Sequence, residues 1–199
     1  MSKIILLLSS FFLSTAVIAD APILFKPPTT GAPTTQRGGG TRGISNTSIQ
    51  LQALVPTGQV GLTAQASPNL YWYVSEAAPY SVEFSLSVES TGEVIAEETL
   101  PPVTKAGIQT IKLNSFNAQL AEGSDYLWSI ALVIDPTQRG KDILISVPIR
   151  RNPTTIDLND GAKLAQAGFW YDTLQYVTEK KSSQVQDLLK QAGITLGGK

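Results

Sequence analysis

Four short stretches of this sequence hold side chains that could do chemistry. They are RGGGTRG at residues 37–43, YWY at 71–73, DLNDG at 157–161 and FWYD at 169–172. A glycine-rich loop can cradle phosphate, an acidic loop can bind calcium, and aromatic faces beside a carboxylate can bind a sugar. Each chemistry needs its residues at a particular spacing, and the spacing decides between a site and a structural role.

The RGGGTRG stretch does not have the spacing of a phosphate-binding loop. Such a loop has the pattern G-x-x-x-x-G-K-[ST] and lies between a strand and a helix. Here no Lys-Ser/Thr pair follows the glycines, and the next element is a strand. We expect no nucleotide site. Arg37 and Arg42 remain candidate contacts to an anionic glycan or lipid, or to a carboxylate of the protein, and the alternative is a simple tether.

The DLNDG stretch resembles a calcium loop only in part. It is one residue short before its glycine, and Phe169 falls near the place where the twelfth-position Glu is needed. We expect Asp157 or Asn159 to cap a helix, and Asp160 to favour the positive end of that helix. No metal site is predicted.

The aromatic stretches are the candidate ligand contacts. Trp72, Trp170 and Tyr171, with Asp172 beside them, are the residue types that stack on sugars and bind their hydroxyls. The alternative is core packing, because Tyr171 lies at helical spacing from Leu174 and one face of YWY must be inside.

Catalysis and cofactors are not expected. The chain of 199 residues has no Cys and no His, which excludes zinc sites, thiol nucleophiles and imidazole bases. No S-x-x-K motif precedes a helix. The 16 acidic residues allow a carboxylate-based hydrolase as an alternative. The formal net charge is −1 without a Lys/Arg patch, so nucleic acid is not an expected partner.

The first 19 residues have the three-part pattern of a secretory signal peptide. Lys3 precedes an apolar run over residues 4–13, and Val17 and Ala19 occupy the −3 and −1 positions of a cleavage site. A membrane anchor is the alternative, but this run is well short of the roughly 20 residues that span a bilayer. We expect export to the periplasm, outer envelope or extracellular space, with no transmembrane segment after cleavage.

Residues 20–47 are rich in Pro, Thr and Gly and have no apolar periodicity. We expect a disordered or loosely attached arm, because so little apolar surface cannot offset the entropy of ordering. Ile23, Leu24 and Phe25 are the exception, since they could dock on the rest of the protein.

Residues 48–151 have the pattern of an antiparallel β-sandwich. Period-two alternation predicts about seven strands, clearest at residues 81–89, where Val82, Phe84 and Leu86 alternate with polar residues. The spacing is typical of an immunoglobulin- or fibronectin-like sandwich, and a closed barrel is the alternative. The predicted strands are residues 48–56, 69–75, 80–90, 93–100, 107–113, 120–134 and 143–149.

The spacing L-x-x-G-x-x-Y at Leu120, Gly123 and Tyr126 resembles the tyrosine corner of such sandwiches. In that corner the tyrosine hydroxyl bonds to the backbone a few residues upstream, so we expect these three residues to be structural.

Residues 152–199 have helical periodicity and are predicted to pack on the sandwich. The first of two helices carries Leu164, Tyr171 and Leu174 on one stripe. The second begins at a capping box of Ser183 and Gln186 and ends near Gly193.

The ordered set of motifs resembles an exported bacterial family catalogued as domain of unknown function 928. The set is QRGGGTRG, LQALVP, GLT, SPNLYWYV, the Leu120–Tyr126 corner, AGFWYDTL and LLKQAGI, over about residues 36–195. The resemblance implies secretion and no known activity, substrate or cofactor. This chain departs from the family at Ile134, where a Cys is usual, and at Val147-Pro148, where Gly-Trp is common.

We therefore expect a non-catalytic secreted or envelope protein with a protein-binding or accessory role, whose partner is another envelope or extracellular protein. A carbohydrate-binding module that uses exposed aromatic residues is the first alternative, with a glycan as ligand. The carboxylate-based hydrolase is the second.

Overall fold

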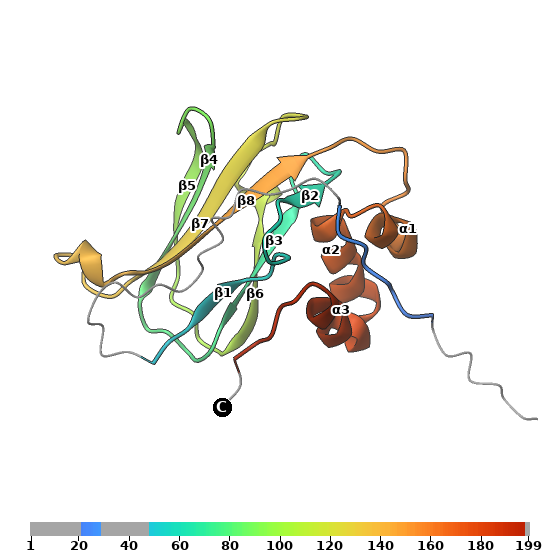
Figure 1. Cartoon of the computed structure of the whole chain (residues 1–199). Coiled ribbons are helices and arrows are strands. Elements are labelled where there is room, and N and C mark those ends of the chain that lie inside the picture. Colours follow the sequence, from blue (N-terminus) through green and yellow to red (C-terminus); the bar gives the residue numbers. More distant parts are fainter. Residues whose placement is uncertain (1–20, 29–47, 198–199) are drawn as a thin grey trace, which may run out of the picture.

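Within the residues that the structure describes, the fold is mainly β, as the sequence predicts, with two sheets and three α-helices. The computed structural model describes residues 21–28 and 48–197 (Figure 1). In these ranges the strands are β1 (Leu51–Ala53), β2 (Gly61–Thr63), β3 (Asn69–Val74), β4 (Ser81–Val88), β5 (Val94–Leu100), β6 (Gly107–Lys112), β7 (Asp125–Val133) and β8 (Ile143–Arg151). The helices are α1 (Gly161–Gln166), α2 (Trp170–Lys180) and α3 (Val185–Gln191).

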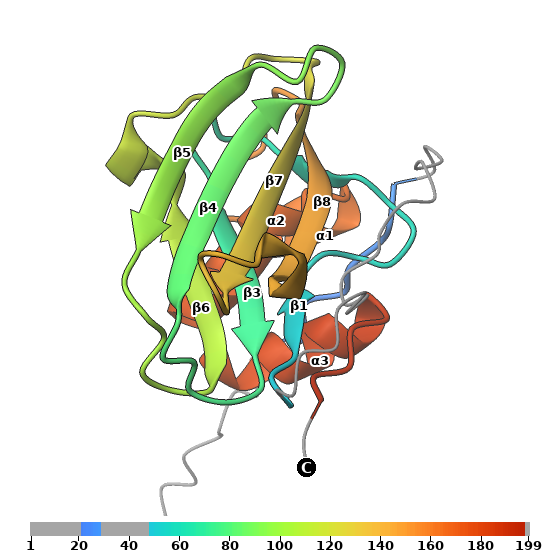
Figure 2. The ribbon, with the colours of Figure 1, turned by 90° about the vertical axis from the view of Figure 1, so that its left-hand side faces the viewer.

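The strands form two sheets that lie face to face (Figure 2). The smaller sheet has the order β1-β3-β6, and the larger has the order β2-β8-β7-β4-β5. Neighbouring strands are antiparallel except β2 and β8, which are parallel. The β2 strand is the element that the sequence prediction missed, because three residues are too few to show a period.

Alternation along the central strands places the core between the sheets. In β4, Val82, Phe84 and Leu86 are buried, and the register sets Phe84 opposite Ile130 of β7. Burying a large apolar side chain stabilises the fold by about 1.5–3 kcal/mol relative to exposing it. The outward positions of the same strands carry small and polar side chains, so one face of the larger sheet is left to solvent.

The helical region has one break more than predicted. The expected first helix is divided at Gly168, which has a φ of +81° that other residues rarely adopt. A Cβ at this position would also lie 3.0 Å from Cδ of Pro28. The cap of α1 is Asp160, whose side chain accepts a hydrogen bond from the Lys163 N–H at 3.0 Å. This corrects the expectation that Asp157 or Asn159 is the cap.

The start of α3 differs from the prediction, and its end agrees with it. Residues Ser182–Gln184 form a 3₁₀ turn and no side chain caps α3, so the Ser183–Gln186 capping box is not formed. At the other end Gly193 has a φ of +73°, and the Ile194 N–H donates to the Leu189 carbonyl at 2.9 Å. That bond completes a Schellman end. Within the described ranges, every helix is too short or too polar to cross a bilayer.

Residues 21–28, which we call the strap, lie extended along the helices (Figure 1). Ile23 and Phe25 are buried in the main core, and Phe25 packs edge-on against Trp170 with ring centroids 4.9 Å apart. The Lys26 N–H donates to the Ala165 carbonyl at 3.0 Å. The expected docking of this stretch is thus present for Ile23 and Phe25, whereas Leu24 is 61 % exposed, and residues 21–28 are held more firmly than the expected arm. Residues 29–47, with Arg37 and Arg42, lie outside the described ranges.

Candidate functional site

The aromatic residues that the sequence offered as ligand contacts are enclosed in the core. Trp170 and Tyr171 are fully buried and Trp72 is 3 % exposed. The Trp170 indole N–H donates to the Leu54 carbonyl at 2.6 Å, and the Tyr171 hydroxyl accepts from the Trp128 indole N–H at 2.8 Å. Burial raises the pKa of the Tyr171 hydroxyl. These rings lie in the core, as the core-packing interpretation predicts, and none of them is an exposed contact for a glycan.

Asp172 is also buried and has a structural place. Its carboxylate accepts hydrogen bonds from the Ala64 N–H at 2.9 Å and from the Gln65 side-chain amide at 3.0 Å. Burial raises the pKa of this carboxyl, and these hydrogen bonds partly oppose the rise. Since Ala64 and Gln65 directly follow β2, Asp172 fastens the start of α2 to the edge of the larger sheet. Its oxygens are engaged in that attachment.

The tyrosine corner has the geometry of a structural element. The Tyr126 hydroxyl accepts a hydrogen bond from the Ala121 N–H at 2.8 Å. Gly123 has a φ of +73°, and its N–H donates to the Arg151 carbonyl at 2.8 Å. Leu120 is buried beneath the corner. These residues fix the entry into β7 and lie away from the open face of the sheet.

An open groove of about 420 Å³ lies on the outer face of the larger sheet. Its floor is formed by outward positions of β4 and β7, where Ser85, Ser129 and Ala131 are small enough to leave a hollow. Ser129 and Ser146 hydroxyls bond to each other at 2.8 Å on the same face. Leu144 of β8 is 53 % exposed at the rim, so the groove offers an apolar contact beside polar ones.

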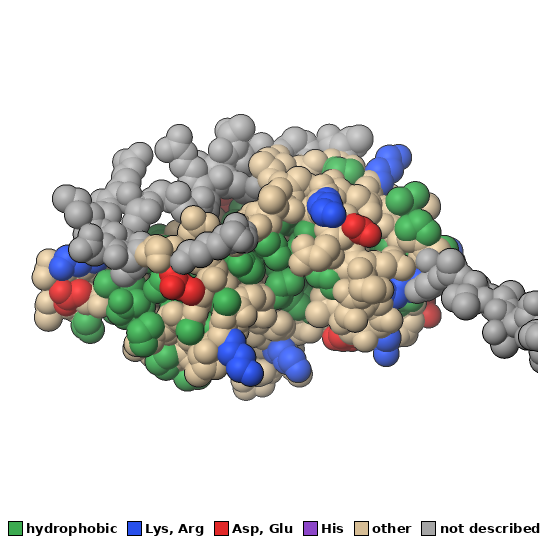
Figure 3. All heavy atoms as spheres, turned by 90° about the horizontal axis from the view of Figure 1, so that it is seen from below, with side chains coloured by type: hydrophobic (Ala, Val, Ile, Leu, Met, Phe, Trp, Pro, Cys, Tyr) green, Lys and Arg blue, Asp and Glu red, His purple; other side chains and the backbone are tan. Residues whose placement is uncertain are grey.

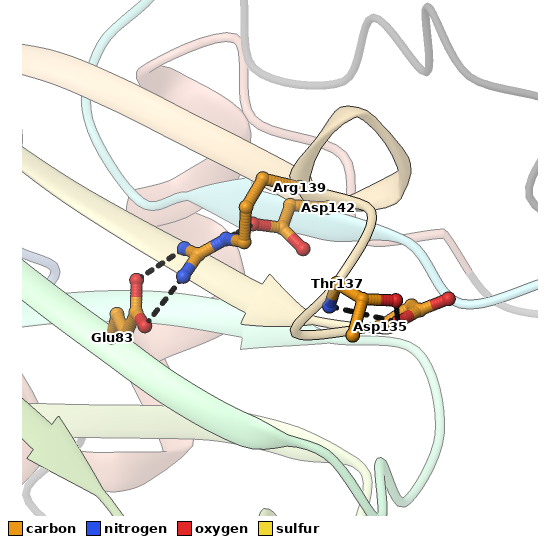
Figure 4. Close-up of polar contacts among 5 residues, drawn as sticks. All are labelled: Glu83, Asp135, Thr137, Arg139 and Asp142. Carbon is orange, nitrogen blue, oxygen red and sulfur yellow. Dashed lines mark hydrogen bonds and ion pairs between the residues drawn. The ribbon is translucent and has the colours of Figure 1, made fainter.

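The β7–β8 connection borders this groove and places the Arg139 guanidinium in its lining. Arg139 Nη1 donates to Glu83 Oε1 at 2.9 Å and its Nε donates to Asp142 Oδ2 at 2.6 Å (Figure 4). The hydrogen bonds from Arg139 lower the pKa of the Glu83 carboxyl, and those to the two carboxylates raise the pKa of Arg139. Glu83 is thereby held ionised.

The same connection is fixed in shape by a local turn. Asp135 Oδ1 accepts hydrogen bonds from the Thr137 N–H at 2.9 Å and from the Thr137 hydroxyl at 2.7 Å (Figure 4). These bonds lower the pKa of the Asp135 carboxyl. The turn therefore sets the position from which Arg139 reaches the groove.

The groove has an excess of negative charge. Its lining contains the carboxylates of Glu83, Glu97 and Asp142 and one guanidinium, that of Arg139, which leaves two negative charges unbalanced. Asp142 Oδ1 is buried and has no hydrogen-bond partner within the described ranges. Such a lining attracts a cation or a donor of hydrogen bonds. Seen from below, the surface shows hydrophobic side chains with blue and red charged side chains scattered among them (Figure 3).

Sequence reasoning did not find this groove. Arg139 stands in a stretch, DPTQRGKD, that predicts only a turn, and the serines of β4 and β7 have the pattern of any solvated strand face. The signal that was present is the smallness of the outward residues on two neighbouring strands. The pairing that brings Arg139 to Glu83 spans 56 residues and depends on the sheet order.

A second hollow, of about 300 Å³, opens between the end of β5 in the larger sheet and β6 in the smaller sheet. It is more apolar than the groove, and Trp72, Val82 and Ile111 are among its lining residues. Leu100, at the end of β5, also lines it. Trp72 thus forms part of the wall of a hollow although little of its surface is exposed.

Comparisons with known proteins give a family and distant structural likenesses. The family described as Domain of Unknown Function (DUF928) matches residues 37–195. No curated protein matches the chain. A solved structure of a β-glucuronidase from Parabacteroides merdae is similar at 14 % identity with a TM-score of 0.35. That likeness covers 76 % of this chain and 25 % of the glucuronidase, so the chain spans a quarter of the length of that enzyme.

Proposed function

The chain belongs to the DUF928 family, and from its own geometry we propose that it is a non-catalytic protein-binding module. Its outer groove takes a cationic segment of a partner protein. The observation that carries this proposal is the unbalanced negative charge of a groove in which Glu83 and Glu97 stand on strands and Asp142 directly precedes β8. Ligand groups on strands are positioned more accurately than groups on mobile loops, which favours selective binding.

The fold supports a binding role. We propose that the two sheets form an immunoglobulin-like sandwich, in which β3 and β6 belong to one sheet and β4, β7 and β8 to the other. The tyrosine corner at Tyr126 is the second feature that favours this assignment. Sandwiches of this kind present open sheet faces and edges rather than deep clefts, and such surfaces suit extended protein ligands.

The partner is expected outside the cytoplasm. The pattern of residues 1–19 favours export, so the partner is an envelope or extracellular protein with a Lys- or Arg-bearing segment.

The two alternatives have less support. A carbohydrate-binding module would use exposed rings, and Trp72, Trp170 and Tyr171 are buried. A carboxylate-based hydrolase would use a protonated acid, and Arg139 lowers the pKa of Glu83 in the groove.

Site-specific photo-crosslinking in the producing cell tests this function. A photoreactive phenylalanine at Leu144, on the rim of the groove, is expected to give a crosslinked protein adduct. The same probe at Lys190, an exposed position of α3 on the other side of the molecule, is the control. The Glu83→Lys change is expected to abolish the adduct at position 144. Equal labelling from both positions, or an adduct that survives Glu83→Lys, would contradict the proposal.

A further inference from the structure

We propose that the outer edge of β5 adds an extended segment of the partner as a further strand, with the second hollow as a side-chain pocket. The segment carries two consecutive basic residues and, two positions from the one on the inner side of the sheet, an apolar residue. This inference names the binding mode of the proposed function, and it rests on that function for its assumption that the ligand is a cationic protein segment.

The β5 strand is the end strand best suited to pairing. It lies at the end of the larger sheet and runs for 7 residues, against 3 residues each for β1 and β2 and 6 residues for β6, which are the other end strands of the two sheets. Among the described strands, only β4 pairs with it. An end strand presents a row of backbone N–H and C=O groups, and an extended peptide can satisfy them as a new ladder.

Charge selects the kind of strand that can pair there. Glu97 and Glu98 are both exposed and are the charged residues of β5, which has no Lys or Arg. A second copy of β5 would bring carboxylates opposite carboxylates, which is destabilising. A strand with Lys or Arg residues at the facing positions would be stabilised by the carboxylates of Glu97 and Glu98. The β5 edge therefore disfavours pairing with a second copy of β5 and favours pairing with a positively charged segment.

The register assigns each carboxylate to one face of the added strand. Glu98 lies opposite Phe84, a core residue, so its side chain is on the inner side of the sheet. Glu97 lies opposite Ser85 and contributes to the outer groove. Because successive residues of a strand alternate between faces, consecutive basic residues of the partner would meet these two carboxylates on opposite sides.

The second hollow supplies the apolar part of the pattern. Leu100 shares the inner side with Glu98, because it lies opposite the buried Val82. It also lines the hollow of about 300 Å³, together with Trp72 and Ile111. A partner residue opposite Leu100 would therefore be directed to the hollow. For an antiparallel segment the order is apolar, any residue, basic, basic, and for a parallel segment the order is reversed.

Titration of the full chain with synthetic peptides tests this mode. The probe is the peptide Thr-Val-Thr-Leu-Thr-Lys-Lys-Thr-Val, together with the peptide of reversed order. Binding is followed by backbone amide NMR shifts and by fluorescence anisotropy. We expect saturable binding of one order, with the largest shifts over residues 94–100. Methylation of alternate backbone nitrogens of that peptide should abolish binding, because a methylated nitrogen cannot donate to the ladder.

Variants of the protein locate the contact. Glu98→Lys is expected to weaken binding about tenfold, the change that corresponds to 1.4 kcal/mol. Asp187→Lys makes the same change of net charge at an exposed site on α3, and it should leave the affinity within about twofold. Equal weakening by both variants would show that only net charge is sensed, and would overturn the inference.

The remaining outcomes separate this inference from the proposed function. If the methylated peptide binds as well as the unmethylated one and the shifts lie at Ser85, Ser129 and Leu144, strand addition is overturned and the groove stands. If shifts lie on β5 and Glu83→Lys has no effect, strand addition stands and the groove falls. If neither peptide order binds saturably, strand addition is overturned, and the crosslink at position 144 decides on the groove separately.

Discussion

Two carboxylates of this protein have opposite environments and opposite consequences. Asp172 is buried between α2 and the residues after β2, and burial raises its pKa. Glu83 lies on the open face of the larger sheet, and its bonds to Arg139 lower its pKa. The ionised form of Asp172 is therefore costly to the fold, whereas Glu83 stays ionised and can offer its charge to a ligand.

Asp172 makes the free energy of unfolding depend on pH. A carboxyl whose pKa is raised in the folded state gives its full stability below the unfolded-state value of about 3.9, and that stability is lost as pH rises through the folded-state pKa. We expect the Asp172→Asn variant to lose less stability than the parent between about pH 4 and pH 7. Urea unfolding of both proteins at the two pH values measures the difference. Parallel pH profiles would contradict this account.

The Trp128–Tyr171 hydrogen bond makes a second prediction at this scale. The Tyr171→Phe change leaves the buried Trp128 indole N–H without its acceptor, which costs about 1–3 kcal/mol. Tyr73→Phe is the matched control, since that hydroxyl donates to the Gly197 carbonyl at an exposed site. We expect its effect on urea unfolding to be the smaller. A Tyr171→Phe protein as stable as the parent would show that the bond has no net value.

At the scale of elements, the strap and the three helices depend on one another. Gln191 of α3 accepts a hydrogen bond from the Phe25 N–H at 2.8 Å and donates to the Ile23 carbonyl at 3.0 Å. The Gln191 side-chain amide thus bonds to a backbone N–H and a backbone carbonyl of the strap, as a neighbouring strand would. Gln184 makes a similar pair of bonds, accepting from the Ile23 N–H and donating to the Ala21 carbonyl.

The strap is expected to contribute measurably to stability. Phe25→Ala should lower the free energy of unfolding by about 3 kcal/mol, because the ring packs on Trp170 in the core. Leu24→Ala is the matched control, since that neighbouring side chain is 61 % exposed. Thermal unfolding of both variants is the measurement. Equal and small effects would show that the strap adds little to the fold.

The elements differ in how far the sequence predicts them, and the reasons are physical. The alternation of β4 predicts both its strand and its buried face. The Gly168 break carries no local signal beyond the glycine, whose φ of +81° ends α1. The groove was missed for a similar reason, since Arg139 and Glu83 meet only through the order of the strands. The sequence allows either ligand contact or core packing for Trp170 and Tyr171, and their burial shows that they pack in the core.

At the scale of the whole molecule, one main hydrophobic core joins both sheets, the helices and the strap. Phe84 of β4, Trp72 of β3, Tyr171 of α2 and Ile23 of the strap all belong to it. Residues that share one core lose their packing together, so we expect unfolding to be a single cooperative transition. The predicted division near residue 151 marks a change of secondary structure within this shared core.

Removal of the helices tests whether the two sheets depend on the shared core for their stability. A fragment of residues 48–151 would expose the core side of Tyr71 and leave Trp128 without its hydroxyl partner. We expect it not to adopt a stable fold, with poor dispersion of its amide NMR signals. The full chain is the control. A well-dispersed fragment spectrum would show that the two sheets are independently stable.

The bonds between Gln191 and the strap have a consequence for the time course of synthesis. They join residues up to 168 positions apart, so the strap obtains these partners only after α3 has been made. Until α3 emerges, Ile23 and Phe25 have no complete site to enter and stay available to chaperones. Docking of the strap therefore follows the synthesis of α3, and a chain interrupted before α3 is distinguished from one that contains it by two uncovered apolar side chains of the strap.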